Sequence, residues 1–99
     1  MLWQILCSFV YLKIYNTLLY FDKIPKDEVE AFHKKISSNI QKIRKEKGVS
    51  QHDLALSMGI ESFAFYSNCE NLRYGKHFNI EHIFKISRIL EVDIEEFFR

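Results

Sequence analysis

The sequence predicts an all-α fold, a compact domain of five helices preceded by an apolar N-terminal extension. Apolar residues recur every three or four positions over most of the chain, which is the period of an amphipathic helix. Capping residues and glycines stand where these runs begin and end, and no segment shows the alternation typical of a strand. With 47% hydrophobic and 27% charged residues among 99, the chain is globular and long enough for one small core.

The extension comprises residues 1–24, and the helical domain is expected over residues 25–99. All but five of the first 21 residues are apolar or aromatic, a length that could span a bilayer. Three interpretations stay open: an interaction arm packed on the domain or on a second subunit, a membrane anchor, or upstream sequence absent from the mature protein. We expect the arm, because Lys13 near the centre would cost roughly 2.5–3.5 kcal/mol in a bilayer.

The first helix of the domain is expected from Pro25 to about Gly48. Proline suits the first turn of a helix, the acids that follow complement the helix dipole, and glycine favours the end. Ser37 and Ser38 leave open a break into two shorter helices. The apolar stripe consists of Val29, Phe32, Ile36, Ile40 and Ile43.

Residues 50–70 predict two short helices joined by a tight turn. Ser50 is a good N-cap for the first, Gly59 allows the turn a positive φ, and the second begins near Ser62. Helices this short and this close must cross steeply, as in the helix-turn-helix unit that presents its second helix to the DNA major groove. The expected inner positions are Leu54, Ala55, Met58, Ile60, Phe65, Tyr66 and Cys69.

Two further helices complete the domain. Asn79 is the expected N-cap of the fourth, and Asp93 with Glu96 predicts a capping box for a short fifth helix. The intervening loop, residues 71–77, contains Gly75 as its turning residue. The apolar side of these helices is Ile80, Ile83, Phe84, Ile86, Ile89, Leu90, Ile94 and Phe97, and the aromatic residues expected in the core are Tyr66, Phe84, Phe97 and Phe98.

The net charge of +1 favours no class of partner, but the charges are unevenly distributed. Six Lys or Arg residues and one acid lie between His33 and Ser50, whereas four acids and one Arg lie between Glu91 and Arg99. Such a dipolar surface can provide a DNA-facing side, although a solvated lysine-rich helix face would look the same. The candidate phosphate-binding side chains are Arg73, Lys76 and the cluster from Arg44 to Lys47.

Catalytic and metal chemistry are not indicated. Cys7 and Cys69 form neither a disulfide framework nor a metal-ligand spacing, and no two of the four histidines stand four residues apart beside an acid. No nucleophile and base stand at a useful spacing. We therefore expect no catalytic residue, no metal site, no cofactor and no enzymatic activity, in a protein suited to a reducing cytoplasm.

Several motifs occur together in order along the chain. They are Ile-Arg-Lys-Glu-Lys-Gly-Val-Ser-Gln-His-Asp-Leu-Ala from Ile43, then Gly-Ile, then Cys-Glu-Asn, then Ile-Ser-Arg-Ile-Leu-Glu-Val-Asp-Ile-Glu-Glu-Phe-Phe from Ile86. Over Ile36 to Phe98, this arrangement resembles the Cro/C1-type (XRE-like) helix-turn-helix family of phage and bacterial repressors. The resemblance implies a lambda-repressor-like fold and binding to double-stranded DNA.

The resemblance also assigns residues to roles. Gln51 would bond a phosphate from the start of the first motif helix, and Glu70 would close the second. The base-reading positions fall on Ser62, Phe63, Ala64, Ser67 and Asn68. Two departures are visible: the turn carries one extra residue around Ile60 to Ser62, and Leu72 replaces the glycine that often follows Glu-Asn. The reading positions include no Arg or Gln, so we expect specificity either to be modest or to rest on DNA shape, with Asn68 able to pair an adenine edge and Phe63 or Ala64 able to contact a thymine methyl group.

These observations predict a sequence-specific double-stranded DNA-binding transcriptional regulator, repressor-like, acting in the cytoplasm as a homodimer. The alternative is a protein-interaction module, such as an antitoxin-like partner in which DNA binding is weak or lost. A membrane-tethered regulator would follow if the N-terminal extension were an anchor.

Overall fold

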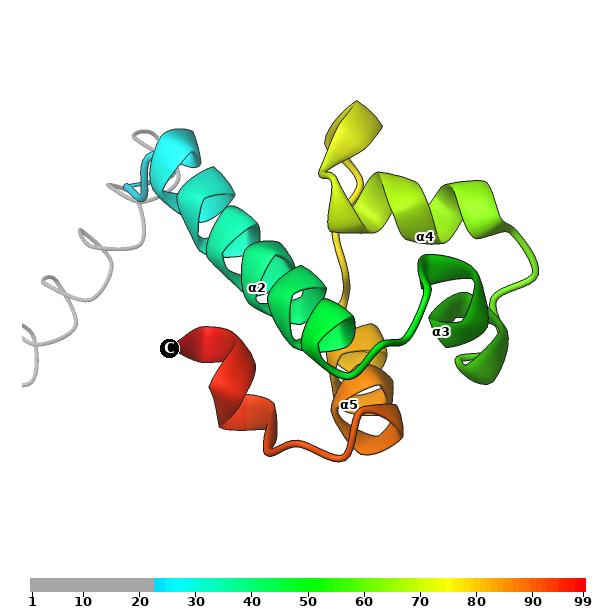
Figure 1. Ribbon diagram of the computed structural model, residues 1–99. Helices are drawn as coiled ribbons and strands as arrows, with labels where there is room; N and C mark the ends of the chain where they lie inside the picture. The colour runs from blue at the N-terminus through cyan, green and yellow to red at the C-terminus, as the bar shows by residue number, and fades with distance from the viewer. Residues whose placement is uncertain (1–22) are drawn as a thin grey trace, which may run out of the picture.

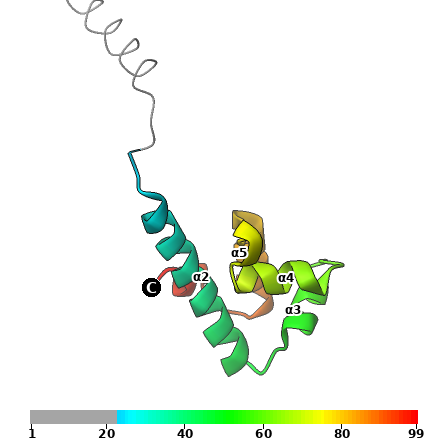
Figure 2. The ribbon, with the colours of Figure 1, turned by 90° about the horizontal axis from the view of Figure 1, so that it is seen from above.

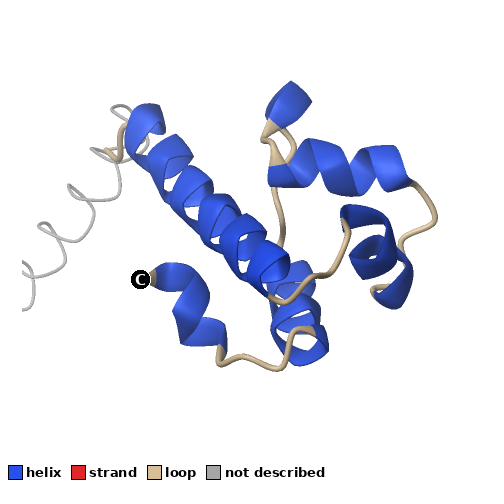
Figure 3. Ribbon diagram, in the orientation of Figure 1, coloured by secondary structure: helices blue, strands red, loops and turns tan. Residues whose placement is uncertain are grey.

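The computed structural model describes residues 23–99, which form helices and connecting turns without a strand (Figures 1 and 3). The α-helices are α2 (Lys26–Glu46), α3 (Gln51–Ser57), α4 (Phe63–Glu70) and α5 (Ile80–Ile89). Two 3-10 helices, η1 (Arg73–Gly75) and η2 (Ile94–Phe98), follow α4 and α5 respectively. The all-α prediction is confirmed, with the expected fifth helix formed as the 3-10 helix η2.

The N-terminal extension lies almost wholly outside the described residues. The interpretations of residues 1–21 as arm, anchor or upstream sequence, and the boundary between residues 24 and 25, therefore stay predictions. Over residues 23–99, no helix combines the length and the apolar character that a membrane crossing requires.

Side-chain caps fix the starts of three helices. The Ser50 hydroxyl accepts a hydrogen bond from the Asp53 N–H at 3.0 Å, and the Asn79 Oδ1 accepts one from the His82 N–H at 2.8 Å. His82 Nδ1 in turn accepts from the Asn79 N–H at 3.1 Å, which completes a capping box. Ser62 caps α4 in the same way, through the Phe65 N–H. Each cap satisfies an amide that the helix leaves without an internal partner.

The capping box predicted at Asp93 and Glu96 is wrong. Asp93 makes no side-chain cap, and the Glu96 N–H instead donates to the Asp93 backbone carbonyl at 3.0 Å. The reason is the 3-10 geometry of η2, whose i to i+3 backbone bonds already occupy that amide.

The core lies between α2 and the other helices. α2 packs on α4 and on η2, and α3 contacts both α4 and α5 (Figures 1 and 2). Asn39 on α2 ties η2 down by donating to the Phe97 and Arg99 carbonyls at 2.9 and 3.0 Å. The buried apolar residues are Ile36, Ile40, Leu54, Ala55, Met58, Tyr66, Cys69, Phe78, Ile83, Ile86, Leu90 and Phe97.

The prediction of the core was wrong at several positions of the apolar stripes. Phe84 is 55% exposed and Phe98 is 37% exposed, although both were expected in the core with Tyr66 and Phe97. Val29, Phe32 and Ile80 are also exposed. Helical spacing gives these helices more apolar positions than the small core can cover, so the outermost positions remain in solvent. Phe78, which was not among the predicted core residues, is buried instead.

α2 is continuous through Ser37 and Ser38, so the break that the sequence left open does not occur. Ser37 is buried, and its hydroxyl donates to the Cys69 carbonyl of α4 at 3.3 Å. A serine that faces a neighbouring helix can satisfy its hydroxyl without interrupting its own helix.

Candidate nucleic-acid interface

The link from α3 to α4 sets the geometry of the candidate site. α3 ends at Ser57 and α4 begins at Phe63, with Gly59 at a φ of 77° between them. The Ile60 N–H donates to the Ala55 carbonyl at 2.9 Å, and the Ile60 side chain packs against the core. This left-handed helix end turns the chain sharply. The two helices consequently run in clearly different directions while remaining packed together (Figure 1).

One face of α4 points outward. Phe63 and Ala64 are exposed, and Ser67 and Asn68 are half-buried, at the positions i, i+1, i+4 and i+5 that share one side of a helix. The inner side carries Tyr66, Cys69 and Glu70, which are buried. We call the outward set, Phe63, Ala64, Ser67 and Asn68, the outer face of α4.

The polar groups of this segment differ in their availability. The Ser62 hydroxyl oxygen is occupied as the N-cap of α4. The Ser67 carbonyl and hydroxyl both accept from Asn71 Nδ2, at 2.9 and 3.4 Å. The Asn68 carboxamide has no hydrogen-bond partner within residues 23–99. Asn68 is therefore the side chain on the outer face whose donors and acceptor are all free for a ligand.

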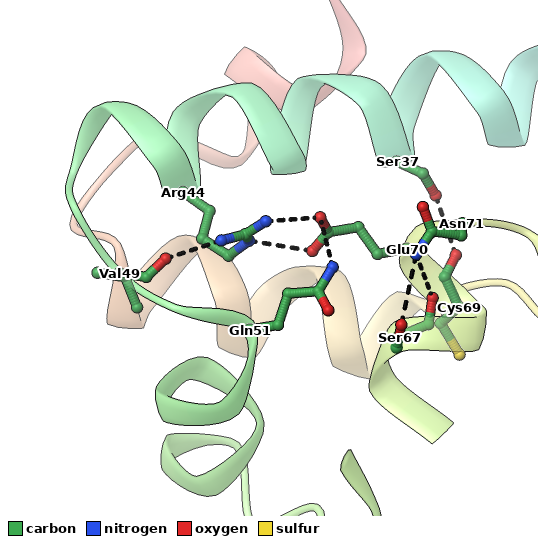
Figure 4. A network of polar contacts seen from close by, with 8 residues as sticks. All are labelled: Ser37, Arg44, Val49, Gln51, Ser67, Cys69, Glu70 and Asn71. Carbon is green, nitrogen blue, oxygen red and sulfur yellow. Dashed lines mark hydrogen bonds and ion pairs between the residues drawn. The ribbon is translucent and has the colours of Figure 1, made fainter. Parts of the chain in front are cut away.

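A buried ion pair fixes the other end of α4 to α2 (Figure 4). Arg44 donates from Nε and Nη2 to the two carboxylate oxygens of Glu70, at 3.1 and 2.9 Å, and from Nη1 to the Val49 carbonyl at 2.9 Å. The side chains are 7% and 0% exposed. Arg44 is thus wrong as a phosphate-binding candidate, because its guanidinium is buried and bonded to Glu70 and Val49 in the interior.

Gln51, the first residue of α3, belongs to the same network. Its Nε2 donates to Glu70 Oε1 at 3.2 Å, and its side chain is half-buried. Burial opposes ionisation of Glu70, but the hydrogen bonds from Arg44 and Gln51 outweigh it and hold the pKa of this carboxyl below its ordinary value. A carboxylate therefore orients the Gln51 carboxamide, which keeps one N–H and its oxygen available for a ligand.

The basic candidates lie apart from the start of α4. Arg73 and Lys76 are exposed in and after η1, at the end of α4 opposite to Phe63 (Figure 1). Lys76 lines a small hollow with Glu30 and His33 of α2. Lys45 and Lys47 are exposed at the end of α2, directly before α3. The outer face of α4 itself carries no Lys or Arg, and these four exposed basic residues lie on neighbouring segments of the chain.

The loop after α4 adopts an unusual backbone. Leu72 takes the left-handed conformation, with a φ of 55°, at the position where the family often has glycine. Tyr74 does the same at 56°, and its side chain is 85% exposed. Gly75 also has a positive φ, as the sequence suggested, so the loop turns at three residues rather than one. This path places Lys76 beside Glu30 and His33 of α2.

One neighbour of the site was missed at the sequence level. His52 of α3 is exposed, and its ring lies 5.9 Å from that of Phe63 at the start of α4. Eleven residues separate the two along the chain, and only the crossing of α3 and α4 brings them together. No local signal could have indicated this contact.

Over residues 23–99, no three His, Cys, Asp or Glu side chains gather as a metal ion would require. Burial raises the pKa of the Cys69 thiol, whose side chain lies in the core. A buried thiol with a raised pKa is a poor nucleophile.

Comparison with known proteins identifies the fold type. A family model described as helix-turn-helix matches residues 40–97, which is more than half of the chain. No curated protein and no solved structure matches. The chain therefore belongs to the Cro/C1-type helix-turn-helix family, a family of DNA-binding regulators, as its motifs predicted.

Proposed function

We propose that this helix-turn-helix protein binds double-stranded DNA with sequence preference and represses transcription, with α4 placed in the major groove. The observation that carries the proposal is the outer face of α4, where Asn68 is unpaired and Phe63 and Ala64 are exposed. The opposite side of the same helix is fixed to α2 by Arg44 and Ser37. A helix held in one orientation can present its outer side chains to base edges without a further ordering cost.

The side chains on this face define the expected readout. The Asn68 carboxamide can pair with the N6 and N7 edge of adenine, and Phe63 and Ala64 can contact a thymine methyl group. The Ser62 and Ser67 hydroxyl oxygens already accept hydrogen bonds within the domain, but the hydroxyls can still donate to a base and discriminate little. The preferred site is therefore expected to be rich in A·T pairs, and part of its recognition to come from DNA shape.

The proposed phosphate contacts come from residues outside the outer face of α4. Gln51 presents its remaining N–H at the start of α3, where the Glu70 carboxylate holds the carboxamide. Arg73 and Lys76 flank one end of α4, and Lys45 and Lys47 precede α3. Phosphate contacts of this kind set orientation and overall affinity, not sequence preference.

A homodimer is part of the proposal. One domain of this size covers one half-site, and two half-sites about 10–10.5 base pairs apart give such proteins their affinity. Selected sites should then be pseudo-palindromes with that spacing.

A second function is favoured by one specific feature, the absence of Arg and Lys from the outer face of α4 together with an exposed Phe63. An apolar, uncharged helix face also suits a protein partner, as in an antitoxin-like module. On this alternative, DNA binding would be weak.

The test is selection from a pool of random duplexes by the full-length protein, followed by titration of the selected duplex against salt. The proposal predicts an enriched A·T-containing site, and an affinity that falls as salt rises because each phosphate contact releases counterions. Lys76→Ala should lower the salt slope by about 1, while Lys85→Ala on α5 should leave it unchanged. Failure to enrich any sequence, with no binding at low salt, would overturn the proposal and favour the protein-interaction alternative.

A further inference from the structure

The first half of α2 carries an apolar surface that the core does not use. Val29 is 42% exposed and Phe32 is 50% exposed, although both continue the stripe in which Ile36 and Ile40 are buried. Phe98 of η2 stacks on Phe32 with ring centroids 6.1 Å apart. We call Val29, Phe32 and Phe98 the α2 apolar surface.

This surface is hollowed and its floor is apolar. The hollow is lined by Ile24, Glu28, Val29, Ala31, Phe32 and Lys35. Glu28 and Lys35 are the charged residues of this lining, and its other residues are apolar. In Figure 2, the first half of α2 lies to one side of α3, α4 and α5, and its side chains Val29 and Phe32 remain 42% and 50% exposed. An exposed hollow of this kind is suited to receive another apolar segment.

We infer that the apolar segment of the same chain, residues 1–21, docks on the α2 apolar surface. All but five of these residues are apolar or aromatic, and the segment ends three residues before Ile24, which lines the hollow. Covalent linkage through so few residues gives the segment a millimolar effective concentration, on the order expected for short linkers. At equal affinity, a free partner would need a comparable concentration to compete.

The length of the segment is sufficient. The α2 residues that line the hollow, from Glu28 to Lys35, span about 10–12 Å at 1.5 Å per helical residue. Fewer than half of residues 1–21 are therefore enough to cover the hollow, in a helical or an extended conformation.

A second copy of the domain is a weaker occupant. A stable interface buries about 800 Å² on each partner, whereas the α2 apolar surface consists of three partly exposed side chains. Two such surfaces would bury too little against each other. The segment of the same chain adds the missing apolar area without the entropic cost of joining two molecules.

The experiment uses the full-length chain and a single reporter. Trp3 is the only tryptophan, so Trp3→Phe combined with Leu18→Trp places one fluorophore in the segment close to the hollow. Docking predicts that this tryptophan is shielded from acrylamide, and that Phe32→Lys increases quenching several-fold. Glu30→Lys, at an exposed polar position of the same helix, should leave quenching unchanged. Far-UV circular dichroism verifies that each variant folds.

Three results would overturn the inference. Equal quenching with and without Phe32→Lys would show that the segment does not lie on this surface. Shielding that increases with protein concentration would assign the segment to a second copy. Shielding that appears only when phosphatidylcholine–phosphatidylglycerol vesicles are added would assign it to a membrane. Because DNA binding is not measured, failure here is distinguishable from failure of the proposed function.

Discussion

Removing Arg44 should destabilise the domain more than removing any exposed charged residue within residues 23–99. The variant Arg44→Met replaces the aliphatic stem of the side chain with an unbranched apolar one but leaves the Glu70 carboxylate, whose side chain is 0% exposed, without its cationic partner. It also leaves the Val49 carbonyl without its donor. Breaking a buried ion pair on one side costs about 3–5 kcal/mol of unfolding free energy. That is a large share of the roughly 5–15 kcal/mol typical of a whole domain.

The assay is urea unfolding followed by far-UV circular dichroism. Lys45→Met is the matched control, since Lys45 is the exposed neighbour on the same helix and should change stability by less than about 0.5 kcal/mol. The double variant Arg44→Met with Glu70→Leu removes both charges and should recover most of the loss, because an apolar pair can replace a buried ion pair. If Arg44→Met does not fold at all, the double variant still tests the reasoning, because it is expected to recover most of the lost stability.

The pH dependence gives a second signature. In the native protein, the pKa of Glu70 is lowered, so its contribution to stability is present above the ordinary glutamate pKa and is lost as pH falls through the lowered value. In Arg44→Met, burial without a cation raises this pKa instead, so stability relative to the native protein should improve toward acid pH. A loss below about 1 kcal/mol for Arg44→Met, or a double variant no better than the single one, would refute the reasoning.

Three further predictions concern the backbone, a cap and the histidines. Glu91 is exposed with a φ of 56°, so Glu91→Gly should raise the unfolding free energy by about 1 kcal/mol, and an unchanged or lower urea midpoint would contradict this. Asn79→Ala removes the cap of α5 and should cost about 1 kcal/mol, while Glu81→Ala, two residues along and exposed, should cost less. Burial lowers the pKa of His82, and burial with the charge of His77 lowers that of His33. Because the unfolded chain then binds more protons, thermal stability should fall as pH drops below about 6.5, and it should fall less in a variant with Gln at both positions.

Local signals in the sequence predicted the start of each α-helix. Ser50 and Asn79 cap their helices through amides three residues further on, and a contact of this range needs no knowledge of the tertiary fold. The all-α class and the turn at Gly59 follow from spacing and from glycine in the same way. Asp93 failed as a cap because its helix formed as a 3-10 helix. The local sequence pattern did not distinguish this 3-10 helix from an α-helix.

Long-range contacts could not be predicted from the sequence. Arg44 and Glu70 are 26 residues apart, and a basic residue among exposed lysines gives no sign that it will be buried. The outer face of α4 could be expected, because helical spacing separates Asn68 from Tyr66. The direction of the loop that carries Arg73 could not be expected. It depends on a left-handed backbone conformation at Leu72, which is unfavourable for leucine.

The most direct test of the central claim compares two duplexes for one variant. If the outer face of α4 reads bases, Asn68→Ala should weaken binding to the selected duplex by about 1–3 kcal/mol, while binding to a random duplex of equal length stays unchanged. Lys76→Ala serves as the contrast, because loss of a phosphate contact should weaken both duplexes equally. Fluorescence anisotropy at one fixed salt concentration measures all four combinations. An Asn68→Ala variant that binds both duplexes as tightly as the native protein, or loses the same affinity for both, would contradict the claim that α4 reads the DNA sequence.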